Sequence, residues 1–466
     1  MSFVKSGLKY STFAGGIHPL DDGKALTRNK REIAAPLPKI VSLFMSQHIG
    51  APAKPLVKKG DIVRKGQLIG ELQGFISANV HASISGKVID VTPLPLPTTG
   101  VKSPAVIIER AEEDLWVDGA DVVSDIDSIS PDEIRQRIKS AGIVGLGGAT
   151  FPTHVKLSPP KNKIIDTVVM NGAECEPYLT CDYHLMLDKP QEIILGLKLA
   201  MKCIGCKKAH IGIESNKEDV YRLFKNILAD ESDIRVDLME VKYPQGAEHQ
   251  LIKALLDREF KPTQLPLEVG AVVINVGTAF AIYEAVKFKR PLIQRLVTVT
   301  GDGVENPQNF MVRLGTPVKQ LLEEAKISTN ISKVIFGGPM MGIAQSNLDT
   351  AATVKGTGGI LVLKGAKQWE SHACIRCGRC IDSCPYGLNP SELSITCEAK
   401  EFALALENNI MECKECGCCT YVCPAKRPIV HLIKFAKAEI AKQTAQRAVQ
   451  SHNKNNKSFK LYVKSD

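Results

Sequence analysis

Two short cysteine-rich stretches decide the fold of the C-terminal part of the chain: Cys374-Ile-Arg-Cys377-Gly-Arg-Cys380-Ile-Asp-Ser-Cys384-Pro385 and Cys413-Lys-Glu-Cys416-Gly-Cys-Cys419-Thr-Tyr-Val-Cys423-Pro424. Both follow the spacing C-x2-C-x2-C-x3-C-P. Ten of the 14 cysteines of the chain fall between Cys374 and Cys423. Because no export signal precedes them, we expect reduced thiols, and their clustering predicts metal binding rather than a disulfide framework.

The spacing has a physical reason. Three thiolates placed two residues apart can bind three irons of one cubane, whereas the fourth cysteine points away and binds the other cluster, as in bacterial ferredoxins. We therefore predict two 4Fe–4S clusters: one on Cys374, Cys377, Cys380 and Cys423, the other on Cys413, Cys416, Cys419 and Cys384. Structural zinc is the alternative, but zinc sites use pairs of C-x2-C rather than triple runs followed by proline.

Composition places the chain among globular multidomain proteins. It has 466 residues, of which 44% are hydrophobic and 23% charged. The net charge is +9, and the segment from His431 onward contributes +6 of it. The rest is nearly neutral, so binding of nucleic acid is not predicted. We see neither a secretory signal nor an apolar run of about 20 residues, and expect no transmembrane segment.

The pattern of strands and turns divides the chain into domains. Residues 1–45 are expected to form an N-terminal arm. Residues 46–110 contain short β-branched strands separated by glycines, which resembles the barrel-sandwich fold of lipoyl and biotinyl domains. The hairpin that would carry the modified lysine reads Ile76-Ser-Ala-Asn-Val80, so we predict a structural or docking module without a carrier arm.

The remainder alternates strands with helices and makes the whole a multidomain α+β protein. Residues 130–288 are predicted to be an α/β domain, whose first helix has Ser130 as N-cap, Pro131 at N1 and Gly142 at C′. In residues 289–365, two strands and a helix capped by Thr316-Pro317 indicate a small β-grasp domain. An α-helical two-cluster domain (366–430) and a basic tail (431–466) follow.

Three loops of the α/β domain carry candidate binding residues. The loop that contains Gly147 and Gly148 follows a helix and lacks a third glycine, so it is not the Rossmann fingerprint. Its backbone can nevertheless approach a phosphate or a flat ring closely, and Lys156 follows it. The turns Asn171-Gly-Ala-Glu174-Cys-Glu176-Pro177 and Tyr243-Pro-Gln-Gly246-Ala-Glu248 supply carboxylates, which accept hydrogen bonds from ribose hydroxyls. Each loop alone is weak support, since a plain glycine turn or a solvated glutamate is as common.

Taken together and in this order, these loops and Asn275-Val-Gly-Thr278 resemble the flavin-bearing, NADH-oxidising subunit of respiratory complex I. They resemble more closely the RnfC family, which supplies one subunit of the Rnf complex, a membrane-bound NADH:ferredoxin oxidoreductase. The match includes Gly15-Gly-Ile-His-Pro19, Asn171–Tyr178 and the paired cysteine motifs, and it covers roughly residues 10–430.

The resemblance implies a set of cofactor-binding residues. A non-covalent FMN would be lined by Gly147, Gly148, Lys156, Asn171, Glu174, Gly246, Glu248, Asn275 and Thr278. NADH would contact Phe151, Glu176 and Tyr243, and no side chain would be catalytic in itself. Two positions depart from the complex I pattern, which has acidic residues where this chain has Ala173 and Ala247. Residues 289–365 resemble the soluble-ligand-binding (SLBB) unit of complex I.

The function implied is an NADH-dependent, translocase-type oxidoreductase subunit, peripheral on the cytoplasmic side of the inner membrane. Electrons would pass through the two clusters to ferredoxin or to another subunit of the complex, including an iron–sulfur subunit, coupled to ion transport. Two alternatives remain: a soluble flavin and iron–sulfur reductase such as a cobalamin reductase, or a non-enzymatic electron-transfer subunit. The roughly 130 residues before the glycine loop argue against the first of these.

Overall fold

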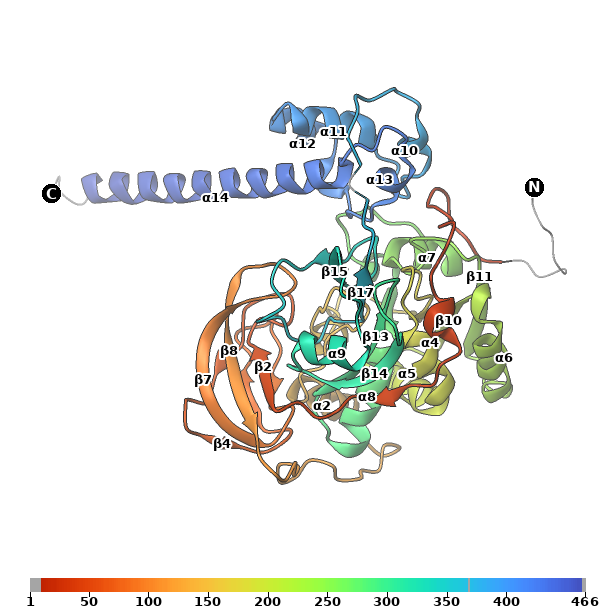
Figure 1. The fold of residues 1–466 in the computed structure, drawn as a ribbon, viewed down its shortest axis with the longest axis vertical. Helices are drawn as coiled ribbons and strands as arrows, with labels where there is room; N and C mark the ends of the chain where they lie inside the picture. The colour runs from red at the N-terminus through yellow and green to blue at the C-terminus, as the bar shows by residue number, and fades with distance from the viewer. Residues whose placement is uncertain (1–9, 368, 463–466) are drawn as a thin grey trace. The chain divides into compact units, whose positions relative to one another are not determined.

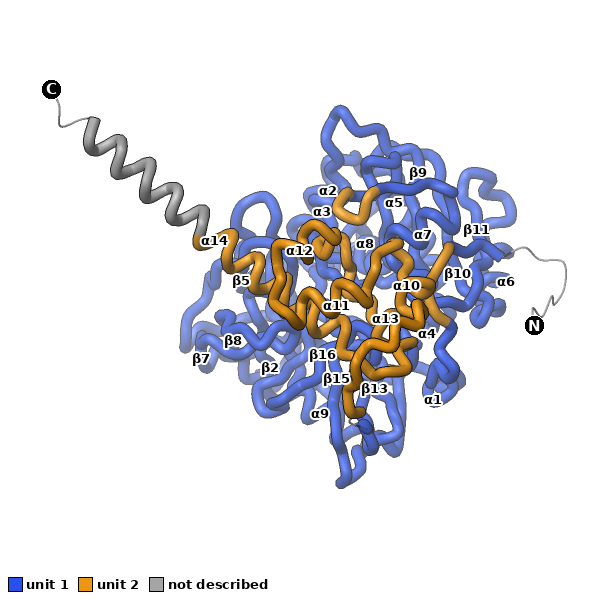
Figure 2. The backbone as a smooth tube through the Cα atoms, turned by 90° about the horizontal axis from the view of Figure 1, so that it is seen from above, with its two compact units in different colours: residues 1–13, 18–260, 265–367 blue, residues 14–17, 261–264, 368–466 orange. Residues whose placement is uncertain are grey.

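The computed structural model describes residues 10–367 and 369–462, with side chains described up to residue 446. It separates into two compact units (Figure 2). Residues 18–260 and 265–367 form most of the first unit, and residues 14–17, 261–264 and 368 onward form the second. The predicted multidomain α+β class is confirmed, because a β sandwich, a parallel α/β layer, a β-grasp sheet and a helical cysteine domain follow one another along the chain (Figure 1).

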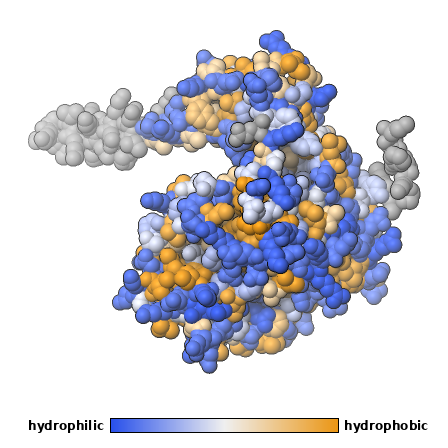
Figure 3. All heavy atoms as spheres, viewed as in Figure 1, coloured by the Kyte–Doolittle hydropathy of each residue, from blue (hydrophilic) through white to orange (hydrophobic). Residues whose placement is uncertain are grey.

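The N-terminal β domain is built from two antiparallel sheets. One contains β2 (Ile40–Phe44), β8 (Lys102–Arg110), β7 (Gly86–Pro95) and β4 (Ile62–Val63); the other contains β3 (Lys54–Pro55), β5 (Leu68–Glu71) and β6 (Val80–His81). β2 comes from the segment expected to be an arm, and its Val41 and Leu43 are fully buried. Apolar side chains also gather on the outer surface over β7 and β8 (Figure 3).

The α/β domain has a four-stranded parallel sheet in the order β11-β10-β9-β12. Its strands are β9 (Thr167–Gly172), β10 (Lys208–Glu214), β11 (Ile234–Met239) and β12 (Ala271–Asn275). Buried side chains alternate between the two faces of β9. Val168 and Met170 pack with α5 (Pro190–Ile204) and α8 (Val276–Phe288), whereas Val169 packs with α7 (Glu248–Leu256). A strand buried on both faces is typical of a parallel sheet covered by helices.

The helices around this sheet are α2 (Pro131–Ser140), α3 (Thr153–Lys156), α4 (Cys181–Asp188), α5 (Pro190–Ile204), α6 (Glu218–Ile227), α7 (Glu248–Leu256) and α8 (Val276–Phe288), with the short helices η1 (Ser215–Lys217) and η2 (Pro266–Val269). α2 begins as predicted: Ser130 accepts a hydrogen bond from the Glu133 amide. α5 and α8 pack closely because Gly196 has no side chain. A Cβ there would lie 1.8 Å from the Ala279 carbonyl oxygen.

The β-grasp domain has a six-stranded mixed sheet: β1 (Ile33–Ala34), β14 (Gln308–Arg313), β13 (Gln294–Thr300), β17 (Gly359–Leu363), β15 (Lys333–Phe336) and β16 (Ile343–Ala344), in that order. α9 (Val318–Glu324) packs on it. The helix begins at Val318, directly after the predicted capping pair Thr316-Pro317, with Pro317 at the N-cap position. Thr316 adds no side-chain cap, because its hydroxyl donates to the Arg313 carbonyl oxygen at 2.7 Å. The arm contributes α1 (Ala25–Arg28) to this first unit.

The second unit is helical: α10 (Arg379–Asp382), α11 (Pro390–Glu398), α12 (Phe402–Glu407), η3 (Ile410–Glu412), α13 (Cys418–Val422) and α14 (Ile429–Tyr462). Ile433, Ala436 and Ile440 of α14 are buried in its core together with Leu393. The first turns of the expected basic tail therefore belong to the packed cysteine domain. Within the described residues, no helix is both long and apolar enough to span a membrane.

Candidate functional sites

The α/β sheet has a topological switch point between β9 and β12. The chain adds β10 and β11 on one side of β9 and then returns to place β12 on the other side. In open α/β sheets, ligands bind beyond the carboxyl ends of the strands at such a point. Asn171 of β9 and Asn275 of β12 are direct neighbours in the parallel ladder. The structure thus brings these two predicted flavin residues side by side.

Asn275 and Thr278 together join three segments at the switch point. Its Oδ1 accepts hydrogen bonds from the amides of Gly277 and Thr278, which caps α8. Its Nδ2 donates to Asp182 at 2.6 Å. The Thr278 hydroxyl accepts a hydrogen bond from the Leu146 amide at 2.9 Å, which fixes the glycine loop over the start of α8.

The glycine loop presents bare backbone. A Cβ on Gly147 would lie 3.3 Å from the Asn275 Cβ, so a side chain would crowd the asparagine. Gly148 has φ +121°, a conformation that favours glycine. No heavy atom beyond its chain neighbours lies within 4 Å of the position that a Cβ would take there. Phe151 closes the loop, since its carbonyl oxygen accepts a hydrogen bond from the Gly145 amide.

The loop that follows β9 is held by Asn171. Its Nδ2 donates to the Gly246 carbonyl oxygen at 2.9 Å, and its Oδ1 accepts from the Ala173 amide at 3.0 Å. The Gly246 amide in turn donates to the Cys175 sulfur at 3.3 Å. Two predicted flavin residues from distant motifs, Asn171 and Gly246, are therefore in direct contact.

Lys156 and Glu248 form an ion pair. The Lys156 Nζ lies 2.7 Å from the Glu248 Oε1 and also donates to the Val273 carbonyl oxygen at 3.0 Å. Glu248 is the first residue of α7, where a carboxylate stabilises the helix dipole. Both residues were predicted to contact FMN, and the structure brings them together as an ion pair whose charges cancel.

A buried cluster of charges supports the loop from 173 to 179. The Lys24 Nζ donates to the carbonyl oxygens of Glu174, Glu176 and Leu179, at 2.8, 3.0 and 2.5 Å. The Lys217 Nζ donates to the Ala173 carbonyl oxygen at 2.6 Å. These lysines were not predicted as functional, because their partners lie far away in the sequence.

Burial perturbs the acids of this cluster. Burial raises the pKa of Glu174 to about 7, although Lys24 opposes the shift. The Glu174 Oε1 accepts from the Asp182 amide at 2.7 Å, whereas its Oε2 has no hydrogen-bond partner. Burial likewise raises the pKa of Asp182. Such perturbed carboxyls beside a ligand crevice are typical of functional sites.

Glu176 contacts the β-grasp domain. Its carboxylate accepts hydrogen bonds from the amides of Met340 and Met341, at 3.2 and 2.8 Å. A Cβ on Gly338 would lie 2.2 Å from the Glu176 Oε2, so this glycine permits the approach. Burial raises the pKa of Glu176 to about 7. Tyr243, which was also assigned to NADH, is 1% exposed and lines a cavity whose wall includes neither Met340 nor Met341.

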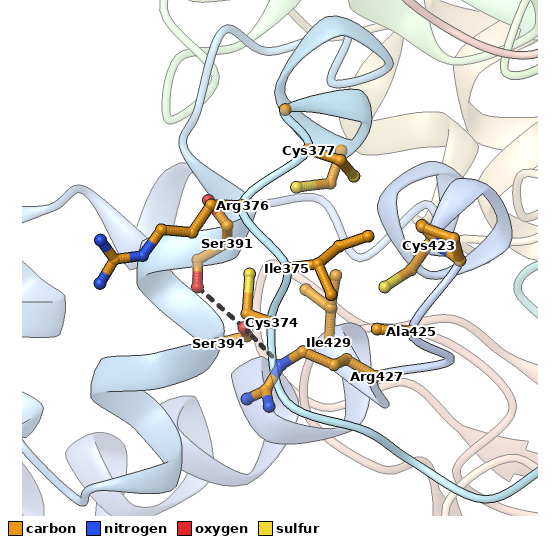
Figure 4. A pocket seen from close by; sticks show the side chains of 13 residues that line it. Cys374, Ile375, Arg376, Cys377, Ser391, Ser394, Cys423, Ala425, Arg427 and Ile429 are labelled. Carbon is orange, nitrogen blue, oxygen red and sulfur yellow. Dashed lines mark hydrogen bonds between the residues drawn. The ribbon is translucent and has the colours of Figure 1, made fainter.

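The cysteines of the second unit line two separate hollows. Cys374, Cys377, Cys380 and Cys423 line the first. Figure 4 shows the sulfurs of Cys374, Cys377 and Cys423 directed into it. Cys384, Cys413, Cys416 and Cys419 line the second, with Cys418 beside them. Each hollow combines three cysteines of one motif with the fourth cysteine of the other motif, as the spacing predicts.

Burial opposes ionisation of several of the thiols that line the two hollows. Burial raises the pKa of Cys413 to about 11, and it raises the pKa of Cys380 and Cys384 as well. Cluster binding would therefore release protons. The ammonium group of Lys437 lies near the second hollow, because its Nζ donates to the Cys413 carbonyl oxygen at 2.6 Å. Gly16 of the N-terminal segment belongs to this unit, and its amide donates to the Ser383 carbonyl oxygen at 3.0 Å.

The residues present fit both kinds of group. Four thiols around each hollow are the donor set of a 4Fe–4S cluster. The open backbone at Gly148, at a sheet switch point, fits a phosphate or a flat ring. The fold and these sites define a flavin-binding, iron–sulfur electron-transfer protein.

Comparison with known proteins agrees with that class. Residues 11–113 match the RnfC barrel sandwich hybrid domain, 138–284 the Nuo51 FMN-binding domain, 296–344 the SLBB domain and 368–388 the 4Fe–4S binding domain. The chain is 44% identical to the C subunit of the proton-translocating ferredoxin:NAD(+) oxidoreductase complex of Clostridium ljungdahlii, covering 92% of this chain and 94% of that protein.

Two further relatives are similar over nearly the whole chain. The C subunit of the Na(+)-translocating ferredoxin:NAD(+) oxidoreductase complex of Acetobacterium woodii is 44% identical, covering 94% of this chain and 98% of that protein. The C subunit of the ion-translocating oxidoreductase complex of Rhodobacter capsulatus is 38% identical, covering 94% and 85%. The chain belongs to the RnfC family, the C subunits of Rnf-type ion-translocating oxidoreductase complexes.

Proposed function

We propose that this chain is the electron-input subunit of a membrane-associated Rnf-type complex, exchanging electrons with NADH through FMN and with other subunits through two 4Fe–4S clusters. Bound FMN would exchange an electron pair with the nucleotide, and the clusters would carry single electrons. The relatives' association with ferredoxin, NAD(+) and ion translocation supports this assignment.

The observation that carries the proposal is the sorting of the eight motif cysteines into two hollows of four. Each hollow draws its fourth cysteine from the opposite motif. A single zinc site would need only one set of four thiols. The arrangement therefore favours two clusters close enough in one small domain to pass electrons in series.

The side chains of the first unit bind and orient. Asn171, Asn275 and Thr278 fix the loops around the switch point. Gly147 and Gly148 leave their backbone open to a flavin, and Lys156 with Glu248 stands at the start of α7. Phe151, Glu176 and Tyr243 are the proposed contacts of NADH. Glu176 can meet a ribose only on the part of its carboxylate that Met340 and Met341 leave free.

The complex would hold this subunit on the cytoplasmic side of the membrane. The +6 charge from His431 onward could contact anionic lipid or a neighbouring subunit. An iron–sulfur subunit of the same complex is the proposed electron acceptor.

The test is anoxic reduction of the full chain by NADH, followed by absorbance near the iron–sulfur bands and by EPR. We expect cluster reduction in the flavin-loaded protein and its loss when FMN is removed. Restoration by added FMN would support the route. Equal cluster reduction with and without FMN would contradict it.

A further inference from the structure

The glycine pair Gly15-Gly16 lies against the loop that carries Cys384. Residues 14–17 group with the second unit, although most of that unit consists of residues from 368 onward. The pair begins the motif Gly15-Gly-Ile-His-Pro19, to which the proposed function assigns no role. Because Cys384 lines the second cysteine hollow, the pair lies where it can influence one of the two proposed clusters.

Two contacts join the pair to the end of the first cysteine motif. The Gly16 amide donates a hydrogen bond to the Ser383 carbonyl oxygen at 3.0 Å. A Cβ on Gly15 would lie 3.0 Å from the Cys384 carbonyl oxygen and 3.1 Å from the Pro385 Cα. Both of these neighbours are backbone atoms, so they could give way only if the Cys384 peptide moved. Gly15 also has φ +75°, a conformation that favours glycine.

The contact lies at the end of the short helix that connects the two hollows. Cys380, in α10, lines the first hollow, and Cys384, which follows the C-cap Ser383, lines the second. Carbonyl groups at the end of a helix have no partner within the helix. The Gly16 amide supplies that partner for Ser383. The N-terminal segment therefore fixes the backbone next to the ligand that the first motif gives to the second cluster.

We propose that Gly15 and Gly16 are positioning residues for Cys384, and that they hold its thiolate in the place that the second cluster requires. The inference rests on the two proposed clusters and adds the segment on which one of them depends. Partners outside the ligand shell orient metal ligands, and their loss typically costs roughly 10–100-fold in metal affinity. A change at Gly15 should therefore weaken the second cluster strongly without removing any ligand.

A role in packing alone predicts a different result. Cysteines of both hollows, among them Cys380 and Cys419, belong to one hydrophobic core. If the glycine pair only stabilised this core, a substitution there would labilise both clusters together. None of the contacts described above involves a cysteine of the first hollow. If the pair positions Cys384, the second cluster alone should become labile.

The test compares the wild-type full chain with Gly15→Ala, both purified under anoxic conditions. A chelator removes iron from each protein, and EPR of reduced samples taken at intervals shows which cluster is lost. Cys384→Ser and Cys374→Ser, each lacking a ligand of one cluster, identify the two sets of EPR signals. We expect the second cluster of Gly15→Ala to be lost about tenfold faster or more than in the wild type. Iron should fall quickly from about eight to about four atoms per chain and then slowly, at the wild-type rate of the first cluster.

The matched control is Gly74→Ala in the first unit. Gly74 has φ +73°, close to that of Gly15, and no heavy atom beyond its chain neighbours lies within 4 Å of the position of a Cβ there. It therefore reproduces the backbone cost without the contact, and both clusters should keep their wild-type rates. If Gly15→Ala does not accumulate, Gly15→Asn places the same Cβ against Cys384 at a lower backbone cost, because asparagine adopts positive φ more readily. The EPR line shape of its second cluster should change before any iron is lost, while that of the first should not.

The possible outcomes separate this inference from the proposed function. Equal acceleration for both clusters would assign the glycine pair to packing and overturn the inference. Wild-type rates and line shapes for the second cluster in both Gly15 variants would also overturn it, and the proposed function would stand. If the fully loaded wild-type chain carries fewer than two clusters, the inference and the two-cluster part of the proposed function both fail.

Discussion

Replacing Lys24 by methionine tests the buried support of the loop from 173 to 179. Lys24 is 6% exposed, and its Nζ donates to three backbone carbonyl oxygens of that loop. The loop also holds Glu174 and Tyr178 at positive φ, of 48° and 71°, which costs free energy for residues other than glycine. Without Lys24 the loop would keep this strain and lose the three hydrogen bonds that the Lys24 ammonium group donates to it.

The magnitude follows from the hydrogen bonds. A hydrogen bond to a charged donor contributes about 1.5–3 kcal/mol, and an unpaired buried carbonyl costs a similar amount. Methionine also removes the cost of burying an ammonium group, which offsets part of the loss. We expect the free energy of unfolding to fall by about 2–4 kcal/mol. The unfolding midpoint should drop on the order of 5–10 °C, and FMN affinity should fall with it.

The pH dependence distinguishes this mechanism from simple loss of packing. The pKa of Glu174 is about 7 in the folded chain, raised mainly by burial and held down by Lys24. A carboxyl whose pKa is raised on folding favours the folded state below its unfolded pKa, and that advantage is lost as pH rises through the folded value. Without Lys24 the pKa of Glu174 should rise further. The variant should therefore be more strongly destabilised at pH 8 than at pH 6.

The assay is thermal unfolding of both proteins at pH 6 and pH 8, at one scan rate, with FMN affinity measured in parallel. The matched control is Lys30→Met, an exposed lysine whose Nζ donates to one carbonyl oxygen, that of Pro307, at 2.9 Å. Equal midpoint changes for the two variants, or a Lys24 effect that does not grow with pH, would refute the reasoning.

Three further predictions concern other parts of the chain. Cys384→Ser should weaken the EPR signal of the cluster on the second motif and spare the first, whereas Cys397→Ser, a buried cysteine outside both hollows, should change neither; equal loss of both signals would contradict the exchanged ligands. His81 has a pKa lowered to about 3 by burial and by Lys355, so the free energy of unfolding should fall as pH drops from about 6.5 toward 3, by up to roughly 1.4 kcal/mol per pH unit. His81→Gln should flatten this slope; an unchanged slope would rule out His81 as its source. Deleting residues 447–466 spares the buried part of α14, and the shortened chain should leave membranes that contain its partner subunits if the tail is the anchor; continued sedimentation would place attachment elsewhere.

Local signals in the sequence predicted part of the fold. The caps of α2 were visible in Ser130 and Pro131, because capping depends on neighbouring residues. β11 was not predicted, since Arg235 and Asp237 interrupt its apolar pattern. In the fold the Asp237 carboxylate lies 2.7 Å from His210 Nδ1 of β10 and 2.6 Å from Arg235 Nε. These neighbours compensate the polar residues, and they come from a strand pairing that no short window shows.

The candidate sites also have some features that follow from local sequence and others that depend on the fold. The membership of the two cysteine hollows follows from spacing, because three ligands of each cubane lie within one tight loop and the fourth comes from the other motif. The contact between Asn171 and Gly246 needed the order of strands in the sheet. Lys24 and Lys217 could not be found from sequence, because a buried lysine is recognised only by the carbonyl oxygens it meets. α8 was likewise missed, since its apolar start continues the run of β12 until Asn275 caps it.

The measurement that tests the central claim most directly is the content of iron, acid-labile sulfide and flavin in the full chain purified under anoxic conditions. The two four-cysteine hollows and the flavin crevice predict about eight iron and eight sulfide atoms, together with one FMN released by acid, per chain. Stoichiometric zinc without sulfide, or a single cluster's worth of iron in fully loaded protein, would contradict the two-cluster account, and the absence of FMN from protein that retains both clusters would contradict the flavin route.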